Sequence, residues 1–274
     1  RIADYAFCRS RFTRFVLPLT LEKVGAYAFA ESAVRQVEFG GLRTIGEFAF
    51  AQCKDLHAVT LPDSLRVIPE NAFRESGLQT VSFGSDLEKI GARAFYSTEL
   101  TSVVFPKTLQ TIGEYAFFSA SLASLRLGNA VREIGNYAFA ENSNLAAISV
   151  SGGTRIGKGA FKNTAYVLNG DNVEEDGCVY LGDTLLTVTG GAAIVRVRNN
   201  ARCISDIGRP LSALYVPESV CEYGGMLENI DTVFFRTAKL PQMHGVRCAV
   251  VPKNTEKYVY NSDTKFYYEG SPEE

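Results

Sequence analysis

The chain has 274 residues, of which 46% are hydrophobic and 21% are charged, and its formal net charge is −2. That composition is typical of a folded globular protein and excludes intrinsic disorder. A charge near zero argues against nucleic acid or an anionic membrane surface as a partner. No apolar run in the sequence reaches the roughly 18 residues that a membrane-spanning helix needs.

An Ala-Phe pair that recurs through the first 161 residues organises the chain. The phenylalanines of the pairs are Phe7, Phe29, Phe50, Phe73, Phe95, Phe117, Phe139 and Phe161. Around each pair the frame L-x-x-V-x-L-P-x-x-L-x-x-I-G-x-x-A-F returns, most cleanly in residues 56–73. Self-similarity at a nearly fixed period of about 22 residues is the signature of a repeat architecture.

Each copy of the frame begins with a strand pattern. The segment L-x-x-V-x-L ends in period-two alternation, which predicts a short half-buried strand. A proline or glycine follows, such as Pro62 or Gly84, and ends the strand. The later leucine, isoleucine and Ala-Phe positions turn further apolar side chains inward. One copy cannot bury all of these side chains, whereas stacked copies cover one another, so we expect a solenoid.

The frame and its spacing resemble a known class of repeats. The recurring I-G-x-x-A-F signature is similar to that of the BspA-like leucine-rich repeats, over residues 1 to about 165. The resemblance implies a mainly β repeat fold, a right-handed superhelix with a sheet of parallel strands on one face. Members are typically secreted or cell-surface proteins of host-associated bacteria or of some protists, and several act as adhesins.

The glycine that follows the isoleucine of the frame has a packing explanation. Gly25, Gly46 and Gly91 occupy this slot, but Ala3 and Pro69 occupy it in other copies. Proline is restricted to negative φ, so the slot does not demand a left-handed conformation. We therefore expect close approach of neighbouring coils to select glycine here.

The frame decays after residue 161, and a different local pattern follows. Residues 179–181 and 185–188 favour two short strands around the tight turn at Gly182 and Asp183. We expect a hairpin-like insert at residues 166–191.

Weak copies of the frame resume after the insert, with strand patterns that start at Ala192, Leu211, Ile230 and Val246. We expect residues 192–274 to continue the solenoid as degenerate repeats and a C-terminal cap, with a last strand, a short helix and a frayed tail at 270–274. A separate α/β domain is the alternative. The first coil lacks a cap, so further repeats or a cap are expected before Arg1. The predicted organisation is thus regular repeats at 1–165, the insert at 166–191 and the degenerate repeats at 192–274.

Two stretches carry residues that bind ligands in other proteins. Residues 152–159 nearly spell the phosphate-binding loop G-x-x-x-x-G-K-[ST], but Gly159 stands where a magnesium-binding hydroxyl belongs. The frame already explains Ile156 and Gly157. The acidic group before Gly177 does not match the spacing of a calcium-binding loop. Its residues are Asp171, Glu174, Glu175 and Asp176. We predict no cofactor and no metal.

Histidines and cysteines give no catalytic pattern. His57 and His244 have no nucleophile placed by a motif, and G-x-S-x-G is absent from the sequence. The spacing of the six cysteines does not fit a zinc site, and one or two disulfides in the second half remain open. Cys53 takes a slot where the resembling family often has a cysteine, which implies a buried packing role. We predict that the protein is not an enzyme.

Two rows of residues are candidate binding sites. Outward positions of the strands alternate with buried ones and form a polar, weakly charged row without aromatic residues. Its candidate residues are Arg14, Gln36, Glu38, Thr60, Thr80, Ser82, Ser102, Ser124 and Arg126. The position before Ala-Phe forms an aromatic row of Tyr5, Tyr27, Phe48, Tyr115 and Tyr137, interrupted by Asn71 and Arg93. Packing between coils is the alternative explanation of the aromatic row, and a merely solvated face that of the polar row.

These features favour a non-enzymatic binding protein, extracellular or on the cell surface, with a host or extracellular protein as its partner. An adhesin-like role follows from the resemblance, because the fold alone does not determine function. A structural spacer that presents another domain is one alternative, and a carbohydrate-binding surface protein is another.

Overall fold

The computed structural model divides the chain into two compact units, which are described separately. Unit 1 comprises residues 1–154 and 160–168, and unit 2 comprises residues 155–159 and 169–274. Within these units the structure describes residues 1–151, 153–174, 177–189, 191–236, 240–252 and 264–268.

The predicted strands of unit 1 form one face of its stacked coils, one coil for each copy of the frame. They are β1 (Arg14–Val16), β3 (Gln36–Glu38), β5 (Ala58–Thr60), β7 (Thr80–Ser82), β10 (Ser124–Arg126) and β12 (Ala147–Ser149). Their pairing is parallel, and the registers of β1 with β3, β5 with β7 and β10 with β12 are 22 or 23 residues apart. The middle residue of each strand points inward, as predicted from the alternation. Residues 102–104 occupy the same place without forming a strand.

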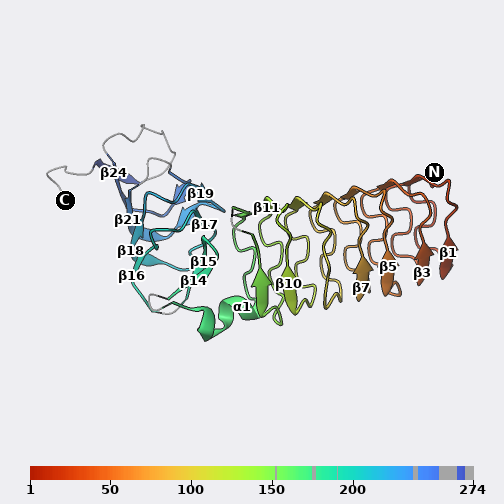
Figure 1. The fold of residues 1–274 in the computed structure, drawn as a ribbon, viewed down its shortest axis with the longest axis horizontal. Helices are drawn as coiled ribbons and strands as arrows, with labels where there is room; N and C mark the ends of the chain where they lie inside the picture. Colours follow the sequence, from red (N-terminus) through yellow and green to blue (C-terminus); the bar gives the residue numbers. More distant parts are fainter. Residues whose placement is uncertain (152, 175–176, 190, 237–239, 253–263, 269–274) are drawn as a thin grey trace. The chain divides into compact units, whose positions relative to one another are not determined.

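A second row of strands lies along another side of unit 1, and the sequence did not predict it. The row consists of β2 (Lys23–Val24), β4 (Thr44–Ile45), β6 (Val67–Ile68), β8 (Lys89–Ile90), β9 (Thr111–Ile112) and β11 (Glu133–Ile134). In each of them the second residue, the isoleucine or valine of the frame, is buried. Figure 1 shows β1, β3, β5, β7 and β10 along one side of the stack and β11 along the other. The coils that carry β1 and β3, and those that carry β5 and β7, are therefore joined on two sides by strand pairing, because β2 pairs with β4 and β6 with β8.

The Ala-Phe pairs build the core of unit 1. The eight phenylalanine rings form a continuous stack in which successive ring centroids lie 5.0–5.6 Å apart, with planes within 16° of parallel. Backbone hydrogen bonds run beside the rings, such as those from Phe50 N to Ala72 O and from Phe95 N to Ala116 O, both 2.8 Å. The rings from Phe29 to Phe161 are at most 2% exposed. The Phe repeat of the sequence is thus a single apolar column.

The glycine slot of the frame is a point of close contact between coils. A Cβ added to Gly46 would lie 2.3 Å from Ala26 N and 2.4 Å from Gly25 C, which are backbone atoms that cannot turn aside. Gly46 does not have a positive φ. Packing, and not a left-handed conformation, therefore selects glycine here, as the sequence predicted.

Replacing Gly46 by alanine is expected to lower the free energy of unfolding by roughly 1–3 kcal/mol, the usual cost of overpacking. Gly128 is the matched control, because its added Cβ would meet nothing closer than Lys107 Cα at 4.0 Å. Gly128→Ala should change stability by less than about 0.5 kcal/mol. Urea titration followed by circular dichroism compares the two variants, and equal losses would contradict the contact.

A buried polar row runs three residues after most phenylalanines of the column. Its buried members are Ser32, Cys53, Ser76, Thr98, Asn142 and Thr164. At Ser76 and Thr98 the hydroxyl donates to the phenylalanine carbonyl of its own coil, with distances of 2.8 Å to Phe73 O and 3.0 Å to Phe95 O. Phe73 O also accepts from Ser76 N at 3.2 Å, so the Ser76 hydroxyl adds a second bond to a buried carbonyl oxygen.

Unit 2 contains the predicted hairpin and shorter coils. Its elements are β13 (Arg155–Ile156), the 3-10 turn Gly170–Asn172, β14 (Cys178–Leu181), β15 (Thr184–Val188), β16 (Ile194–Arg196), β17 (Cys203–Ile204), β18 (Leu211–Val216), β19 (Glu222–Tyr223), β20 (Leu227–Glu228), β21 (Ile230–Phe235), β22 (Met243–His244), β23 (Cys248–Val251) and β24 (Lys265–Tyr268). The antiparallel pair β14–β15 is the hairpin, and β15 joins β17 in parallel. A parallel sheet in the order β16-β18-β21-β23-β24 forms the strand face.

The fold class is confirmed: both units are stacks of parallel β coils. The described part of the chain holds a single α-helix, the four-residue α1 (Ala165–Leu168). Strands β16, β18, β21 and β23 lie at the four weak strand patterns expected from the sequence, and β24 is an addition. The expected short helix near the C-terminus and the tail at 270–274 fall outside the described residues.

Candidate binding surfaces

The structure places all nine residues of the predicted polar row on exposed positions. They are Arg14, Gln36, Glu38, Thr60, Thr80, Ser82, Ser102, Ser124 and Arg126. Except for Ser102, each is the first or last residue of a three-residue strand on the strand face of unit 1. Parallel pairing sets Arg14 opposite Gln36, and Thr60 opposite Ser82. We call this row the outward strip.

The first strands of the outward strip differ in chemistry from its middle. At the first strands Arg14 Nη2 donates to Glu38 Oε1 at 2.9 Å, and Gln36 Nε2 donates to the same oxygen at 3.3 Å. Exposed ion pairs of this kind contribute little to stability. In the middle of the strip, the hydroxyl groups of Thr60, Thr80, Ser82, Ser102 and Ser124 have no hydrogen-bond partner among the described residues. These five hydroxyls are free to bond water or a partner.

The predicted aromatic row is a set of rings packed against one another. Tyr5 stacks on Tyr27 at 4.9 Å, and Tyr27 on Phe48 at 4.6 Å, with planes within 5°. Tyr115 stacks on Tyr137 at 5.1 Å beyond the interruption. Because the rings cover one another's faces, mainly their edges are left for a ligand. Their part in binding stays a prediction, and packing between coils accounts for the geometry seen.

Cations and further aromatic rings bridge the interruption of that row. Arg93 Cζ lies 5.1 Å from the centroid of the Tyr115 ring, and Arg74 Cζ lies 5.4 Å from that of Tyr96. Tyr96 in turn stacks on Phe118 at 5.1 Å. Cation–π contacts of this kind stabilise exposed sites modestly. Arg74, Tyr96 and Phe118 follow Ala-Phe directly, a position the sequence analysis did not use.

Every residue of the aromatic row, and of its interruption, has a positive φ, a backbone conformation that residues other than glycine rarely adopt. The φ angles of Tyr27, Phe48 and Arg93 are 54°, 57° and 54°. Their amides donate to the next coil, for example Arg93 N to Glu114 O at 2.9 Å. The conformation carries a cost for residues other than glycine. The ladder of bonds between coils offsets that cost, so the strain here has a structural explanation.

Unit 2 bears an outward site that the sequence analysis missed. Strand register sets Arg196 of β16 opposite Tyr215 of β18, and Tyr215 opposite Phe234 of β21. The Tyr215 and Phe234 rings stack at 4.5 Å with planes 5° apart, and Arg196 Cζ lies 4.6 Å from the Tyr215 centroid. We call these three residues the arginine–aromatic ladder. The signal was present, because they follow the inward residues of the weak copies just as Glu38 follows Val37.

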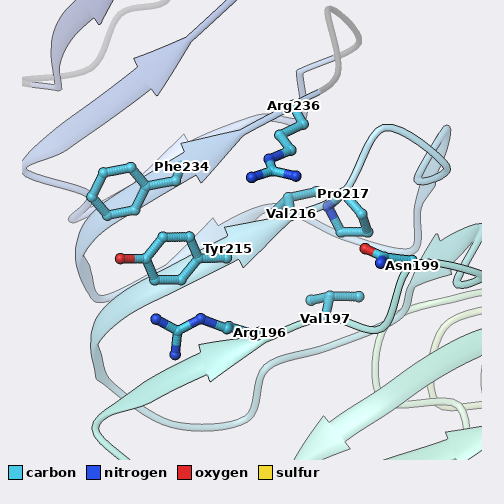
Figure 2. Close-up of a pocket in the computed structure, with 8 residues that line it drawn as sticks. All are labelled: Arg196, Val197, Asn199, Tyr215, Val216, Pro217, Phe234 and Arg236. Atoms are coloured by element: carbon cyan, nitrogen blue, oxygen red, sulfur yellow. The ribbon is translucent and has the colours of Figure 1, made fainter. Parts of the chain in front are cut away.

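A pocket of about 370 Å³ opens beside the arginine–aromatic ladder. Figure 2 shows its lining, in which Arg196 lies on one side of Tyr215 and Arg236 on the other. The remaining lining residues are Val197, Asn199, Val216, Pro217 and Phe234. The lining thus combines two guanidinium groups, an amide and an apolar floor, a mixture typical of ligand-binding sites.

The sequence motifs that suggest ligands elsewhere have structural roles. Within the phosphate-loop-like string, Arg155–Ile156 is strand β13, and Gly159 takes the positive-φ place before Ala-Phe with φ 59°. In the acidic group, Glu174 accepts from Arg198 Nη1 at 3.0 Å. That guanidinium also lies over the Tyr180 ring, with Cζ 3.9 Å from its centroid. Glu175, Asp176 and Gly152 lie outside the described residues.

The surroundings of the cysteines and histidines differ along the chain. None of the six cysteines forms a disulfide. Burial raises the pKa of Cys53 and of Cys203 to about 11, so neither is a ready nucleophile. Cys53 Sγ donates to Phe29 O at 3.0 Å, in the polar row of the core. His57 bonds Gly77 O through Nδ1 at 3.1 Å, and His244 is exposed at the end of β22.

The family model that matches this sequence is the BspA type leucine rich repeat region, with six copies over residues 1–117 and 68–171. The chain belongs to this leucine-rich repeat family. The match covers the regular repeats of unit 1 and the start of the following segment. No curated protein sequence matches significantly. The family assignment thus rests on the repeats themselves.

Several solved structures are similar in fold to this leucine-rich repeat chain. A leucine-rich repeat protein from Bacteroides ovatus is 15% identical, with 93% of this chain and 92% of that chain covered and a TM-score of 0.48. The pneumococcal vaccine antigen PcpA is 16% identical, with 94% and 84% covered and a TM-score of 0.44. A leucine rich cell surface protein from Faecalibacterium prausnitzii is 17% identical, with 99% and 83% covered and a TM-score of 0.39.

No helix among the described residues is long and apolar enough to cross a membrane.

Proposed function

We propose that the chain is a non-enzymatic recognition module of a secreted or cell-surface protein, and that its outward strip binds a host or extracellular protein. The observation that carries the proposal is the exposure of all nine strip residues on one face, with five free hydroxyl groups among them. A regular array of donors and acceptors on parallel strands is engaged as a whole only by a partner with a large, complementary surface.

The chemistry of the strip indicates what kind of protein surface fits it. The residues are short and mostly uncharged, and the charged ones include Arg14 and Glu38, which pair with each other. Such a face complements a flat polar protein surface and offers little attraction to a strongly charged polymer. The absence of a catalytic motif in the sequence supports a binding role, as does the family's association with surface proteins.

A structural spacer is the competing function, and a substitution in the strip separates the two. Thr80→Arg and Ser82→Arg place long charged side chains on exposed positions of β7, where they block docking without disturbing the core. Thr44→Arg is the matched control, because Thr44 is an exposed threonine at the start of β4, in the other row of strands. All three variants should keep the circular dichroism spectrum and melting temperature of the original chain.

The measurement is binding of each variant to a panel of purified extracellular-matrix proteins on a biosensor surface. At least one panel protein should bind the original chain and lose about tenfold or more in affinity with Thr80→Arg and Ser82→Arg. The Thr44→Arg control should bind like the original chain. If no panel protein responds to the strip variants, the spacer function is favoured instead.

A further inference from the structure

The pocket beside the arginine–aromatic ladder has an excess of positive charge. Its two guanidinium groups belong to Arg196 and Arg236, both exposed, and no aspartate or glutamate is among its described lining residues. Neither side chain forms an ion pair with another described residue, whereas Arg198 and Arg247 of the same unit each pair with a carboxylate. Two unpaired cations on one pocket favour an anionic ligand.

The geometry of the ladder indicates which groups of the pocket would attract an anion. The Arg196 guanidinium lies over the Tyr215 ring, with Cζ 4.6 Å from the ring centroid, and its N–H groups donate in the plane of the guanidinium. Stacking at 4.5 Å leaves mainly the edges of Tyr215 and Phe234 toward the pocket. Aromatic edges carry partial positive charge. The guanidinium groups and the ring edges therefore both attract a negatively charged group such as a carboxylate.

The backbone around the pocket excludes recognition by strand addition. Val197 N donates to Tyr215 O at 3.0 Å and Arg236 N donates to Val216 O at 2.9 Å, so the sheet itself uses these groups. An extended peptide on this face would gain no main-chain hydrogen bonds, which are its usual source of affinity at a sheet. A ligand is therefore recognised here by side-chain groups of the pocket and by polar groups of its own. Sugars have them, and the apolar floor of Val197, Val216 and Pro217 suits the C–H face of a sugar ring.

From these observations we infer that the unit 2 pocket binds a carboxylated sugar of the uronic or sialic acid type. One of the two guanidinium groups, which lie on either side of Tyr215, bonds the carboxylate and the other adds positive charge, while Asn199 bonds ring hydroxyl groups and the floor packs against the ring. The volume of about 370 Å³ lies at the lower end of the range for small-ligand sites, enough for a sugar ring. This site is separate from the outward strip of unit 1 and goes beyond the protein-binding role proposed for it.

The experiment measures binding of 3′-sialyllactose and of a hyaluronan tetrasaccharide to the full chain by isothermal titration calorimetry and saturation-transfer NMR. Lactose is the neutral control probe and hexaglutamate is the control for an acidic peptide. At least one of the two acidic sugars should bind, lactose should bind at least about tenfold more weakly, and 0.5 M sodium chloride should weaken the binding.

Substitutions then assign the binding to the pocket. Arg236→Gln and Arg196→Gln should each lower the affinity for the acidic sugar about tenfold or more, since each removes a charge-assisted hydrogen bond or an attractive positive charge. Arg202→Gln is the matched control, an exposed arginine of the same unit that does not line the pocket. It should bind like the original chain, as should Thr80→Arg in unit 1. Normal sugar binding by Thr80→Arg would show that the pocket binds without the outward strip, so the two proposals can fail separately.

Three results would overturn the assignment. In the first, neither acidic sugar binds, or lactose binds as well as sialyllactose. In the second, hexaglutamate binds more tightly than the sugars, which would make the pocket a site for acidic peptides. In the third, Arg236→Gln and Arg202→Gln have equal effects, so that general charge and not the pocket determines binding. Because both arginines are exposed, the glutamine variants should fold normally, and circular dichroism verifies that they do.

Discussion

Replacing Phe95 by alanine is expected to lower the free energy of unfolding by roughly 3–5 kcal/mol, the range for truncating a buried aromatic side chain. Phe95 is fully buried and lies near the middle of the ring column, stacked on Phe73 at 5.3 Å and on Phe117 at 5.1 Å. Its ring also meets Phe83 edge to face at 5.8 Å. Stacked coils share these contacts, so a defect here weakens the coupling between the coils on either side.

Urea titration of the Phe95→Ala variant, followed by far-UV circular dichroism, measures that loss. Ser102→Ala is the surface control from the same coil region and should change stability by less than about 0.5 kcal/mol. Phe7→Ala is the graded control, because Phe7 is only half-buried at the end of the same stack. It should cost clearly less than Phe95→Ala. Similar losses in all three variants would mean that the assignment of inward and outward residues is wrong.

The regular part of the fold could be predicted because each of its rules is local and repeated. The alternation in L-x-x-V-x-L places Val37 inward and Glu38 outward within one strand. The Ala-Phe pair likewise marks an inward position, and it recurs eight times. The second row of strands could not be predicted in this way. A strand such as β4 has two residues, too few for a periodic pattern, and it exists only because the coils lie close enough for backbone hydrogen bonds.

Of the candidate sites, the sequence likewise predicted one and missed another. The exposed positions of the outward strip follow from the strand alternation, and the structure has them exposed as expected. The arginine–aromatic ladder was missed, since the frame of unit 2 is degenerate and Tyr215 and Phe234 are 19 residues apart. Their stacking depends on strand register, which a weak pattern specifies poorly. The same inward-outward rule, once the register is known, places both rings and Arg196 on one face.

Asn142 shows how a single side chain can repair an irregular coil. The slot three residues after Phe117 is Ala120, which has no hydroxyl to donate to Phe117 O. Asn142, one coil later, donates from Nδ2 to Phe117 O and to Phe139 O, both at 2.8 Å. Its Oδ1 accepts from Leu122 N at 2.9 Å. One fully buried amide therefore satisfies three backbone groups in two coils.

Replacing Asn142 by alanine is expected to lower the free energy of unfolding by roughly 3–5 kcal/mol, since each buried group left without a partner costs about 1–3 kcal/mol. Ser76→Ala, which removes one hydroxyl bond to Phe73 O, is the matched control and should cost about 1 kcal/mol. Hydrogen exchange provides a second readout, because the Leu122 amide should lose protection in the Asn142 variant and keep it in the Ser76 variant.

A pair of serines tests the repair directly. In Asn142→Ser the new hydroxyl can donate to Phe139 O, as Ser76 does in its own coil, but Phe117 O and Leu122 N stay without a partner. Adding Ala120→Ser supplies a donor for Phe117 O and should recover roughly 1 kcal/mol of that loss. Ala120→Ser in the original chain should give no such gain, because Asn142 already donates to that carbonyl. A gain of equal size in both backgrounds would show that Asn142 does not compensate for Ala120.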